Sequence, residues 1–302
     1  MSDDATDPAT RAFVAHRNLL FTVAYEMLGS AADAEDVLQE TWLRWAEVDV
    51  GEVRDQRAYL VRITTRQALN RLRTLKRRKE TYVGPWLPEP LATSPDVAED
   101  AELAESVSMA MMLVLETLSP TERAVFVLRE AFALGYDEIA AAVGKNEAAV
   151  RQIAHRARQH VDARRPRRAV RPSETRAALE SFQLALATGD PQRLLDVLAP
   201  EVVLVSDGGG VRSAALRPIT GADKVARFMV GIARKNHLPV SAEPTVVNGS
   251  PAILVRLAGE VDGVIAVRVE DARITGLYYV RNPEKLNRIE SQTPLTRVAA
   301  NE

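Results

Sequence analysis

The sequence predicts a multidomain fold in which two all-α domains are followed by an α+β domain. Three observations support this fold class. Apolar residues recur at helical spacing over most of the first half of the chain. Four prolines between Glu80 and Asp100 interrupt that pattern. After Ser173, β-branched runs alternate with helical stretches. A chain of 302 residues is long enough for two or three such domains.

We expect five parts, with boundaries at the proline-rich stretch and at the basic run that ends at Arg168. These are a three-helix domain (1–80), an acidic proline-rich linker (81–100), a second helical domain (101–168), a cone-shaped α+β domain (173–290) and a tail (291–302).

The first domain reads as three helices. Gly29 closes the first helix, and Ser30 caps the second, which runs over about 31–46. The third runs over about 56–78, with Leu60, Ile63, Leu69, Leu72 and Leu75 toward a core. Its opposite face carries a polar and cationic stripe that could hold phosphates and unstacked bases: Arg62, Arg66, Asn70, Arg73 and Arg77.

The second helical domain contains a helix-turn-helix pattern. Ser119, Pro120 and Glu122 form a capping box with proline at the first helical position. A short helix over 136–143 is followed by the break at 144–146 and then by a helix with an apolar stripe of Val150, Ala154, Ala157 and Val161. The other face offers Arg151, Gln152 and His155 as base readers and Arg156 and Arg158 as phosphate contacts.

The C-terminal part predicts a curved sheet wrapped on helices. Ser173 and Asp190 each cap a helix, and a third helix covers 222–235. Strands are expected over 202–205, 252–257, 264–269 and 274–280. Two helices, a strand, a helix and a meander give an α+β cone.

The net charge of −2 conceals a segregated pattern. Residues 54–79 are dominated by Arg and Lys, 80–122 contain no basic residue, and 145–171 are basic again. Two cationic blocks separated by an acidic one indicate two nucleic-acid contacts.

The absence of cysteine excludes disulfides, thiolate zinc sites and cysteine nucleophiles. No stretch approaches the roughly 18 apolar residues of a membrane span. We therefore expect a soluble, cytoplasmic protein without membrane contact, and we expect no metal and no cofactor.

Three segments resemble the DNA-binding regions of extracytoplasmic-function sigma factors of bacterial RNA polymerase. Residues 33–42, DAEDVLQETW, resemble the helix that binds core RNA polymerase, which implies roles for Asp36, Gln39, Glu40 and Trp42. Residues 57–70 resemble the helix that melts the promoter and reads its −10 element, and 118–161 resemble the region that reads the −35 element. The resemblance implies that core polymerase and promoter DNA are the partners.

The C-terminal half resembles SnoaL-like (ketosteroid-isomerase-like) cone domains, which a sigma-J-like subgroup carries fused to its C-terminus. Three signatures of that subgroup occur in order: WLPEP at 86–90, DGGG at 207–210 and NPEKL at 282–286. In the subgroup the glycine motif usually ends in a basic residue, whereas here Val211 follows and Arg212 comes next. The resemblance implies regulatory interdomain contacts by Trp86, Leu87, Pro88, Glu89, Asp207, Gly208, Gly209, Gly210, Asn282, Pro283, Glu284 and Lys285.

Two functions therefore stand side by side. The first is a sigma factor without enzymatic activity, whose C-terminal domain modulates it in cis. The alternative is a DNA-binding regulator whose cone domain senses an unidentified small ligand or has enzymatic activity. His237 is the single histidine of that domain, and spacing gives Asp207 no acid–base partner, which argues against catalysis. A simple regulator would also have no need for a first domain with both an acidic interface and a cationic stripe.

Overall fold

The computed structural model describes residues 7–164, 172–188, 190–235 and 240–298. The chain divides into two compact units. The helical unit comprises 1–78, 114–165 and 294–302, and the cone unit comprises 79–113 and 166–293. The expected linker, 81–100, thus falls inside the cone unit. The expected boundary run at 165–168 and His237 lie outside the described residues.

The first part of the helical unit contains the three expected helices, α1 (Pro8–Leu28), α2 (Ala31–Trp45) and α3 (Gln56–Glu80). Gly29, with φ of +70°, ends α1, and the Ser30 hydroxyl accepts from the Asp33 amide to start α2. The buried Trp45 indole donates to the Ala9 carbonyl at 2.8 Å, which fastens α2 to the start of α1.

The second part of the helical unit is the helix-turn-helix. It consists of α7 (Pro120–Phe126), a π-helical turn η2 (Val127–Ala131), α8 (Tyr136–Val143) and α9 (Glu147–Asp162). The expected capping box is present in both directions between Ser119 and Glu122. Gly144 ends α8 in the left-handed conformation, and Asn146 caps α9. The predicted stripe of α9 is buried along its whole length.

The cone unit contains a six-stranded sheet in the order β2-β1-β6-β5-β4-β3. Its strands are β1 (Leu198–Asp207), β2 (Ile219–Thr220), β3 (Val240–Val247), β4 (Ser250–Leu257), β5 (Glu260–Glu270) and β6 (Arg273–Val280). Neighbouring strands pair antiparallel except for β1 and β6, which are parallel. The sequence pattern did not predict β2 and β3, because β2 is two residues long and β3 carries Pro244 and Glu243. Proline is tolerated there because β3 is an edge strand.

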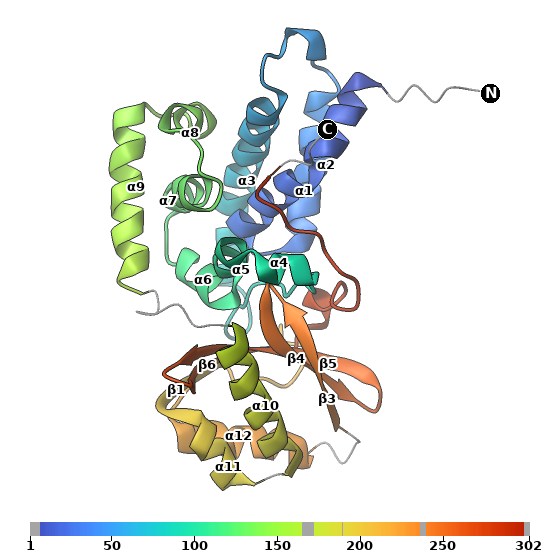
Figure 1. The fold of residues 1–302 in the computed structure, drawn as a ribbon, viewed down its shortest axis with the longest axis vertical. Helices are drawn as coiled ribbons and strands as arrows, with labels where there is room; N and C mark the ends of the chain where they lie inside the picture. Colours follow the sequence, from blue (N-terminus) through green and yellow to red (C-terminus); the bar gives the residue numbers. More distant parts are fainter. Residues whose placement is uncertain (1–6, 165–171, 189, 236–239, 299–302) are drawn as a thin grey trace, which may run out of the picture. The chain divides into compact units, whose positions relative to one another are not determined.

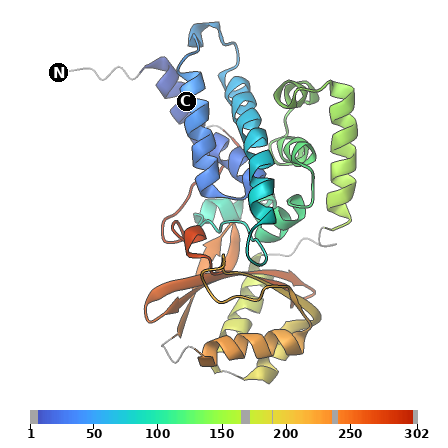
Figure 2. The same cartoon turned by 180° about the vertical axis from the view of Figure 1, so that it is seen from behind.

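Three helices cover one face of this sheet: α10 (Pro172–Thr188), α11 (Pro191–Val197) and α12 (Ala222–Lys235) (Figures 1 and 2). Phe182, Leu204 and Tyr279 belong to the core between sheet and helices. Adjacent strand residues point to opposite faces, so Tyr278 lies in a second core on the other face.

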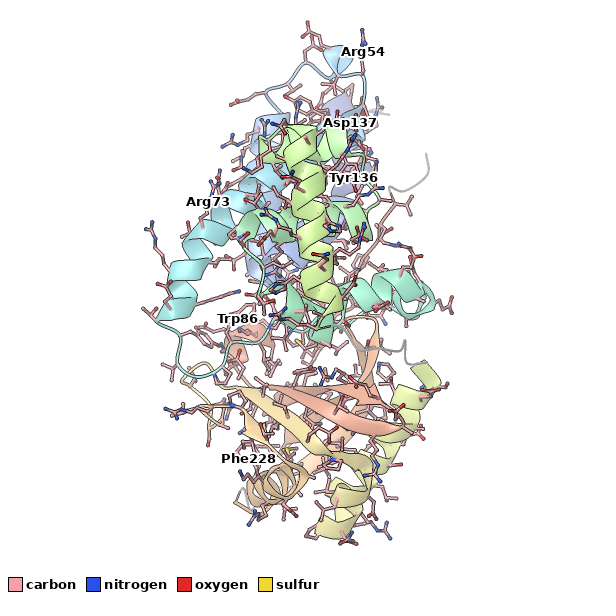
Figure 3. All side chains as sticks on the ribbon, turned by 90° about the vertical axis from the view of Figure 1, so that its left-hand side faces the viewer. Arg54, Arg73, Trp86, Tyr136, Asp137 and Phe228 are labelled. Atoms are coloured by element: carbon pink, nitrogen blue, oxygen red, sulfur yellow. The ribbon has the colours of Figure 1, made fainter. Side chains whose placement is uncertain are left out.

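The linker covers that other face. Its Leu87 and Ala92, together with Met109, pack with Tyr278 and Val280 of β6. Short helices α4 (Pro95–Glu99), α5 (Ala101–Val107) and α6 (Met109–Leu115) follow the proline-rich stretch. Figure 3 shows Trp86 and Phe228 of α12 on opposite sides of the sheet. The cone sheet is therefore buried on both faces, and the linker supplies one of the two layers.

Among the described residues, no helix combines the length and the apolar composition needed to cross a bilayer.

Candidate functional site

The α2 face predicted to bind polymerase is exposed and is joined to α3 by ion pairs. Asp36, Gln39 and Glu40 are exposed, and Trp42 is half-buried with its ring centroid 5.2 Å from that of Phe13. Arg71 of α3 donates to Asp33 and to Asp36, each at 2.7 Å, so the Asp36 carboxylate is held in place. A fixed acidic surface beside a supported aromatic ring has the character of a protein-binding hot spot.

The predicted −10 stripe lies along one side of α3. Arg66, Asn70, Arg73 and Arg77 are exposed, and Arg62 is half-buried with its guanidinium 4.6 Å above the Tyr59 ring. Arg66 donates to the Ala141 carbonyl of α8 at 2.8 Å. One of the expected DNA contacts is thus engaged within the helical unit.

A cavity of about 380 Å³ lies between the start of α3 and α8. Arg62 contributes to its lining, together with Arg54 and Asp137, which Figure 3 labels. The N-terminal half of the −10 stripe therefore faces the helix-turn-helix in this arrangement.

The recognition helix α9 presents all five expected DNA contacts to solvent, Arg151, Gln152, His155, Arg156 and Arg158. Two of them have intramolecular partners. Arg151 pairs with Glu147 at 2.9 Å, and Arg158 pairs with Glu130. Glu130 raises the pKa of Arg158. Gln152, His155 and Arg156 are exposed without a described ion pair.

The three signature segments of the sequence meet in the cone unit around the fully buried Asp207. Its Oδ2 accepts from the Leu87 amide at 2.8 Å and from Lys285 Nζ at 2.7 Å. Its Oδ1 accepts from the Tyr82 hydroxyl at 2.6 Å and from the Gly209 amide at 3.1 Å. One carboxylate therefore joins the linker to both the glycine loop and the segment after β6. We call this set, Asp207, Tyr82, Leu87, Asn282 and Lys285, the Asp207 clamp.

Other members complete the Asp207 clamp. Asn282 donates to the Tyr82 hydroxyl at 2.8 Å, and Lys285 Nζ donates to the Leu87 carbonyl. The centroid of the Trp86 ring lies 4.2 Å from Lys285 Nζ and 3.4 Å from Lys79 Nζ, so both ammonium groups make cation–π contacts with this ring. Burial raises the pKa of Tyr82, and the Asp207 carboxylate raises it further, so the hydroxyl stays a donor at neutral pH.

The glycine loop is shaped by this contact. A Cβ on Gly208 would lie 2.1 Å from the Arg212 carbonyl oxygen, and Gly209, with φ of +62°, would place a Cβ 2.4 Å from Asn282 Nδ2. Gly210 approaches Val83 of the linker. Of the remaining predicted residues, Pro88 and Glu89 are buried, Pro283 is half-buried and Glu284 is exposed.

Several polar residues that the sequence reasoning did not single out are buried in these units. Tyr82, half-buried in the linker, donates to Asp207, and the buried Asn248 accepts from the Leu91 amide of the linker. In the helical unit, Arg123 donates twice to the Glu26 carbonyl at the end of α1 and pairs with Glu116. Only Asn248 carried a usable signal, because Asn-Gly is the favoured dipeptide of a tight hairpin.

The cone unit also contains a buried Tyr279–Asp262–Arg281 network. Arg281 binds both oxygens of Asp262, at 2.9 and 2.7 Å, and the Tyr279 hydroxyl donates to Oδ2 at 2.7 Å. Burial, and then Asp262, raises the pKa of Tyr279. A carboxylate that already accepts three hydrogen bonds is arranged for structure rather than for proton abstraction.

A three-helix domain with a polymerase-type acidic face and a cationic stripe, joined to a helix-turn-helix, is the architecture of a promoter-reading initiation factor. Comparison with known proteins agrees. The Sigma-70 region 2 family matches residues 12–78, and the Sigma-70 region 4 family matches 108–161. The chain is 36% identical over 286 residues to the ECF RNA polymerase sigma factor SigJ of Mycobacterium tuberculosis H37Rv, covering 90% of this chain and 91% of that protein.

Two further comparisons extend over nearly the whole chain. The probable ECF RNA polymerase sigma factor SigI of the same organism is 32% identical over 289 residues, covering 95% of this chain and 97% of that protein. The crystal structure of Mycobacterium tuberculosis SigJ matches with a TM-score of 0.75 and 33% identity, over 95% of this chain and 100% of that one. The chain belongs to the extracytoplasmic function (ECF) RNA polymerase sigma factors. It binds core RNA polymerase and directs promoter-specific initiation. Membership of this family confirms the predicted fold class and the predicted sigma-factor function.

Proposed function

We propose that the cone unit of this cytoplasmic sigma factor controls promoter engagement in cis, by holding the linker between regions 2 and 4. The observation that carries this proposal is the Asp207 clamp, in which a buried carboxylate binds Tyr82 and Leu87 of the linker and Lys285 of the cone. No catalytic step is part of the proposal.

The clamp matters because the length of the linker limits how far apart regions 2 and 4 can lie. The −10 and −35 elements are roughly 25 base pairs apart, or about 85 Å of B-DNA. The stretch 79–113, which holds the linker, α5 and the start of α6, is about 35 residues long and would span roughly 120 Å if fully extended. Part of that stretch is helical in α4 and α5, where each residue advances only about 1.5 Å. A linker folded onto the cone sheet is therefore much shorter than one that is released.

Contacts inside the helical unit support the same proposal. Arg66, an expected −10 contact, is bonded to the Ala141 carbonyl of region 4, and Arg123 of region 4 is bonded to the Glu26 carbonyl of region 2. Simultaneous reading of both promoter elements requires these bonds to open. A protein with such a compact state responds to whatever shifts its population toward the open one.

The residue roles within the DNA- and polymerase-binding regions are part of this proposal. The α2 face with Asp36, Gln39, Glu40 and Trp42 binds core polymerase. The α3 stripe contacts the −10 element, and α9 contacts the −35 element.

The test of cis control is Asp207→Asn. This variant leaves Lys285 without its carboxylate partner. It also replaces one carboxylate oxygen by an N–H₂ group, which cannot accept the hydrogen bonds that this oxygen now accepts. Breaking a buried ion pair costs about 3–5 kcal/mol, so we expect the first part of the linker, 82–87, to be released and promoter-dependent transcription by the reconstituted holoenzyme to rise at least fivefold. Small-angle scattering of the free protein should show a larger particle.

The matched control is Asp271→Asn, which makes the same change at an exposed hairpin residue of the cone. It should transcribe and scatter like the wild type. Wild-type transcription and scattering from Asp207→Asn would show that the cone does not act on the linker.

A second prediction concerns how α9 reads DNA. Loss of a base contact costs about 1–3 kcal/mol at one position, so Arg151→Ala and Gln152→Ala should each relax preference at one position of the −35 element. Arg158→Ala should weaken binding to every sequence and flatten its salt dependence. Fluorescence anisotropy of the holoenzyme on a set of −35 variants at several salt concentrations measures both effects. Equal, sequence-independent losses from all three would remove the base-reading role.

A further inference from the structure

The linker contacts the cone unit at a second place, well separated in sequence from the Asp207 clamp. Asn248, which is buried, lies in the hairpin between β3 and β4 with φ of +54°. Its Oδ1 accepts from the Leu91 amide at 2.9 Å, and its Nδ2 donates to the Val107 carbonyl at 2.8 Å. Its own backbone amide donates to the Leu91 carbonyl at 2.9 Å. A single side chain thus bridges Leu91 of the linker and Val107 at the end of α5, which are 16 residues apart.

The linker is bound here as an added piece of sheet. Ala92 forms an antiparallel bridge with Val247, and the Thr93 amide donates to the Val246 carbonyl at 3.1 Å. On the other side the Ala92 carbonyl accepts from the Thr293 amide at 2.8 Å. Main-chain pairing of an extended segment with a sheet edge is β-augmentation, here by the protein's own linker.

Gly249 fixes how close the linker can come. Its amide donates to the Thr93 hydroxyl at 3.0 Å. A Cβ at this position would lie 2.7 Å from Cα of Ala104 in α5, so only glycine allows α5 to rest on the turn. The neighbouring hairpin has a matching glycine, Gly259, with φ of +88°, where an added Cβ would have no neighbouring atom within 4 Å.

We propose that the Asn248-Gly249 turn is a second linker-binding site, which takes an extended main-chain segment followed by a helix with a small residue at the contact. This proposal rests on the proposed cis control. It adds that the two ends of the linker are held by two separate sites. The Asp207 clamp grips residues just after α3 of region 2. The Asn248-Gly249 turn grips 91–107, directly before the region 4 match begins at residue 108. Each site therefore governs the freedom of one DNA-binding region.

Hydrogen–deuterium exchange of the full-length protein tests the proposal. In Gly249→Ala, the amides of 91–107 should exchange at least tenfold faster, while those of 82–87 keep the wild-type rate. Gly259→Ala adds the same methyl group at a comparable positive φ and should leave both segments unchanged. Asp207→Asn should give the reverse pattern, with faster exchange over 82–87 only.

Thr93→Val provides an arm without backbone strain. It removes the hydroxyl that accepts from the Gly249 amide and keeps the side-chain shape, so exchange over 91–107 should rise as it does in Gly249→Ala. Unchanged exchange over 91–107 in both variants would overturn the second site. Equal acceleration of 82–87 and 91–107 in either variant would also overturn it, because the linker would then be released as one cooperative segment.

Transcription separates this site from the proposed function. The same variants are assayed on promoters whose −10 to −35 spacing is changed by one or two base pairs. Faster exchange with greater tolerance of altered spacing supports both proposals. Faster exchange with unchanged spacing preference keeps the second site and refutes cis control.

Discussion

Reversing the charge of Asp36 and Glu40 together is expected to abolish binding to core RNA polymerase. Both residues are exposed on α2, next to a Trp42 ring that Phe13 supports. Hot-spot residues typically contribute about 2 kcal/mol or more each, so the double variant Asp36→Arg/Glu40→Arg should bind core roughly 1,000-fold more weakly. Co-purification and a titration of labelled core polymerase measure the loss.

The control has to separate the interface from the fold. Asp36→Arg places a second guanidinium beside Arg71, which now pairs with Asp33 and Asp36. Glu40→Arg alone leaves both ion pairs of Arg71 in place, and Glu47→Arg reverses an exposed charge just beyond α2. Glu47→Arg should bind core normally and Glu40→Arg weakly, with circular dichroism unchanged in both. Wild-type affinity in the double variant would show that core polymerase does not bind this face of α2.

Local signals in the sequence predicted the helices well because the groups that start and stop a helix lie within a few residues of each other. The Ser119–Glu122 capping box and the buried stripe of α9 follow from spacing alone. Strand β3 does not, because it is stabilised as an edge strand by pairing with β4 and not by its own composition.

The contacts of the linker, in contrast, join residues that are far apart in the sequence. Asp207 is 120 residues from Leu87, and Asn248 is 157 residues from Leu91. No periodicity connects groups that far apart, so only the resemblance to a sigma factor subgroup brought the first pair together. Asn248 was missed because an Asn-Gly pair is already explained by the hairpin it forms. Its contacts with Leu91 and Val107 can be recognised only in the folded structure.

The largest loss of stability is expected from Asp262→Ala in the cone unit. Asp262 and Arg281 are both almost fully buried and joined by two hydrogen bonds. Removing the carboxylate leaves a buried guanidinium without a counter-charge, which costs about 3–5 kcal/mol. That is a large part of the roughly 5–15 kcal/mol by which a typical domain is stable. Urea unfolding of the full-length protein should show the cone transition at a much lower midpoint.

Two variants decide whether the buried charge is the cause. Glu270→Ala removes the carboxylate of the half-buried Arg268–Glu270 pair at the surface, and a surface ion pair is worth only about 0–1 kcal/mol. Asp262→Leu/Arg281→Met removes both buried charges at once and should recover most of the lost stability, since replacing a buried pair by apolar side chains is often neutral. A midpoint for Asp262→Ala equal to that of Glu270→Ala would contradict the structural role.

Because the Arg281 amide donates to the Asp207 carbonyl at 2.7 Å, the network that holds Arg281 also supports the backbone from which the linker is clamped. Asp262→Ala should therefore release 82–87 in the exchange experiment as well, whereas the apolar double variant should keep that segment protected.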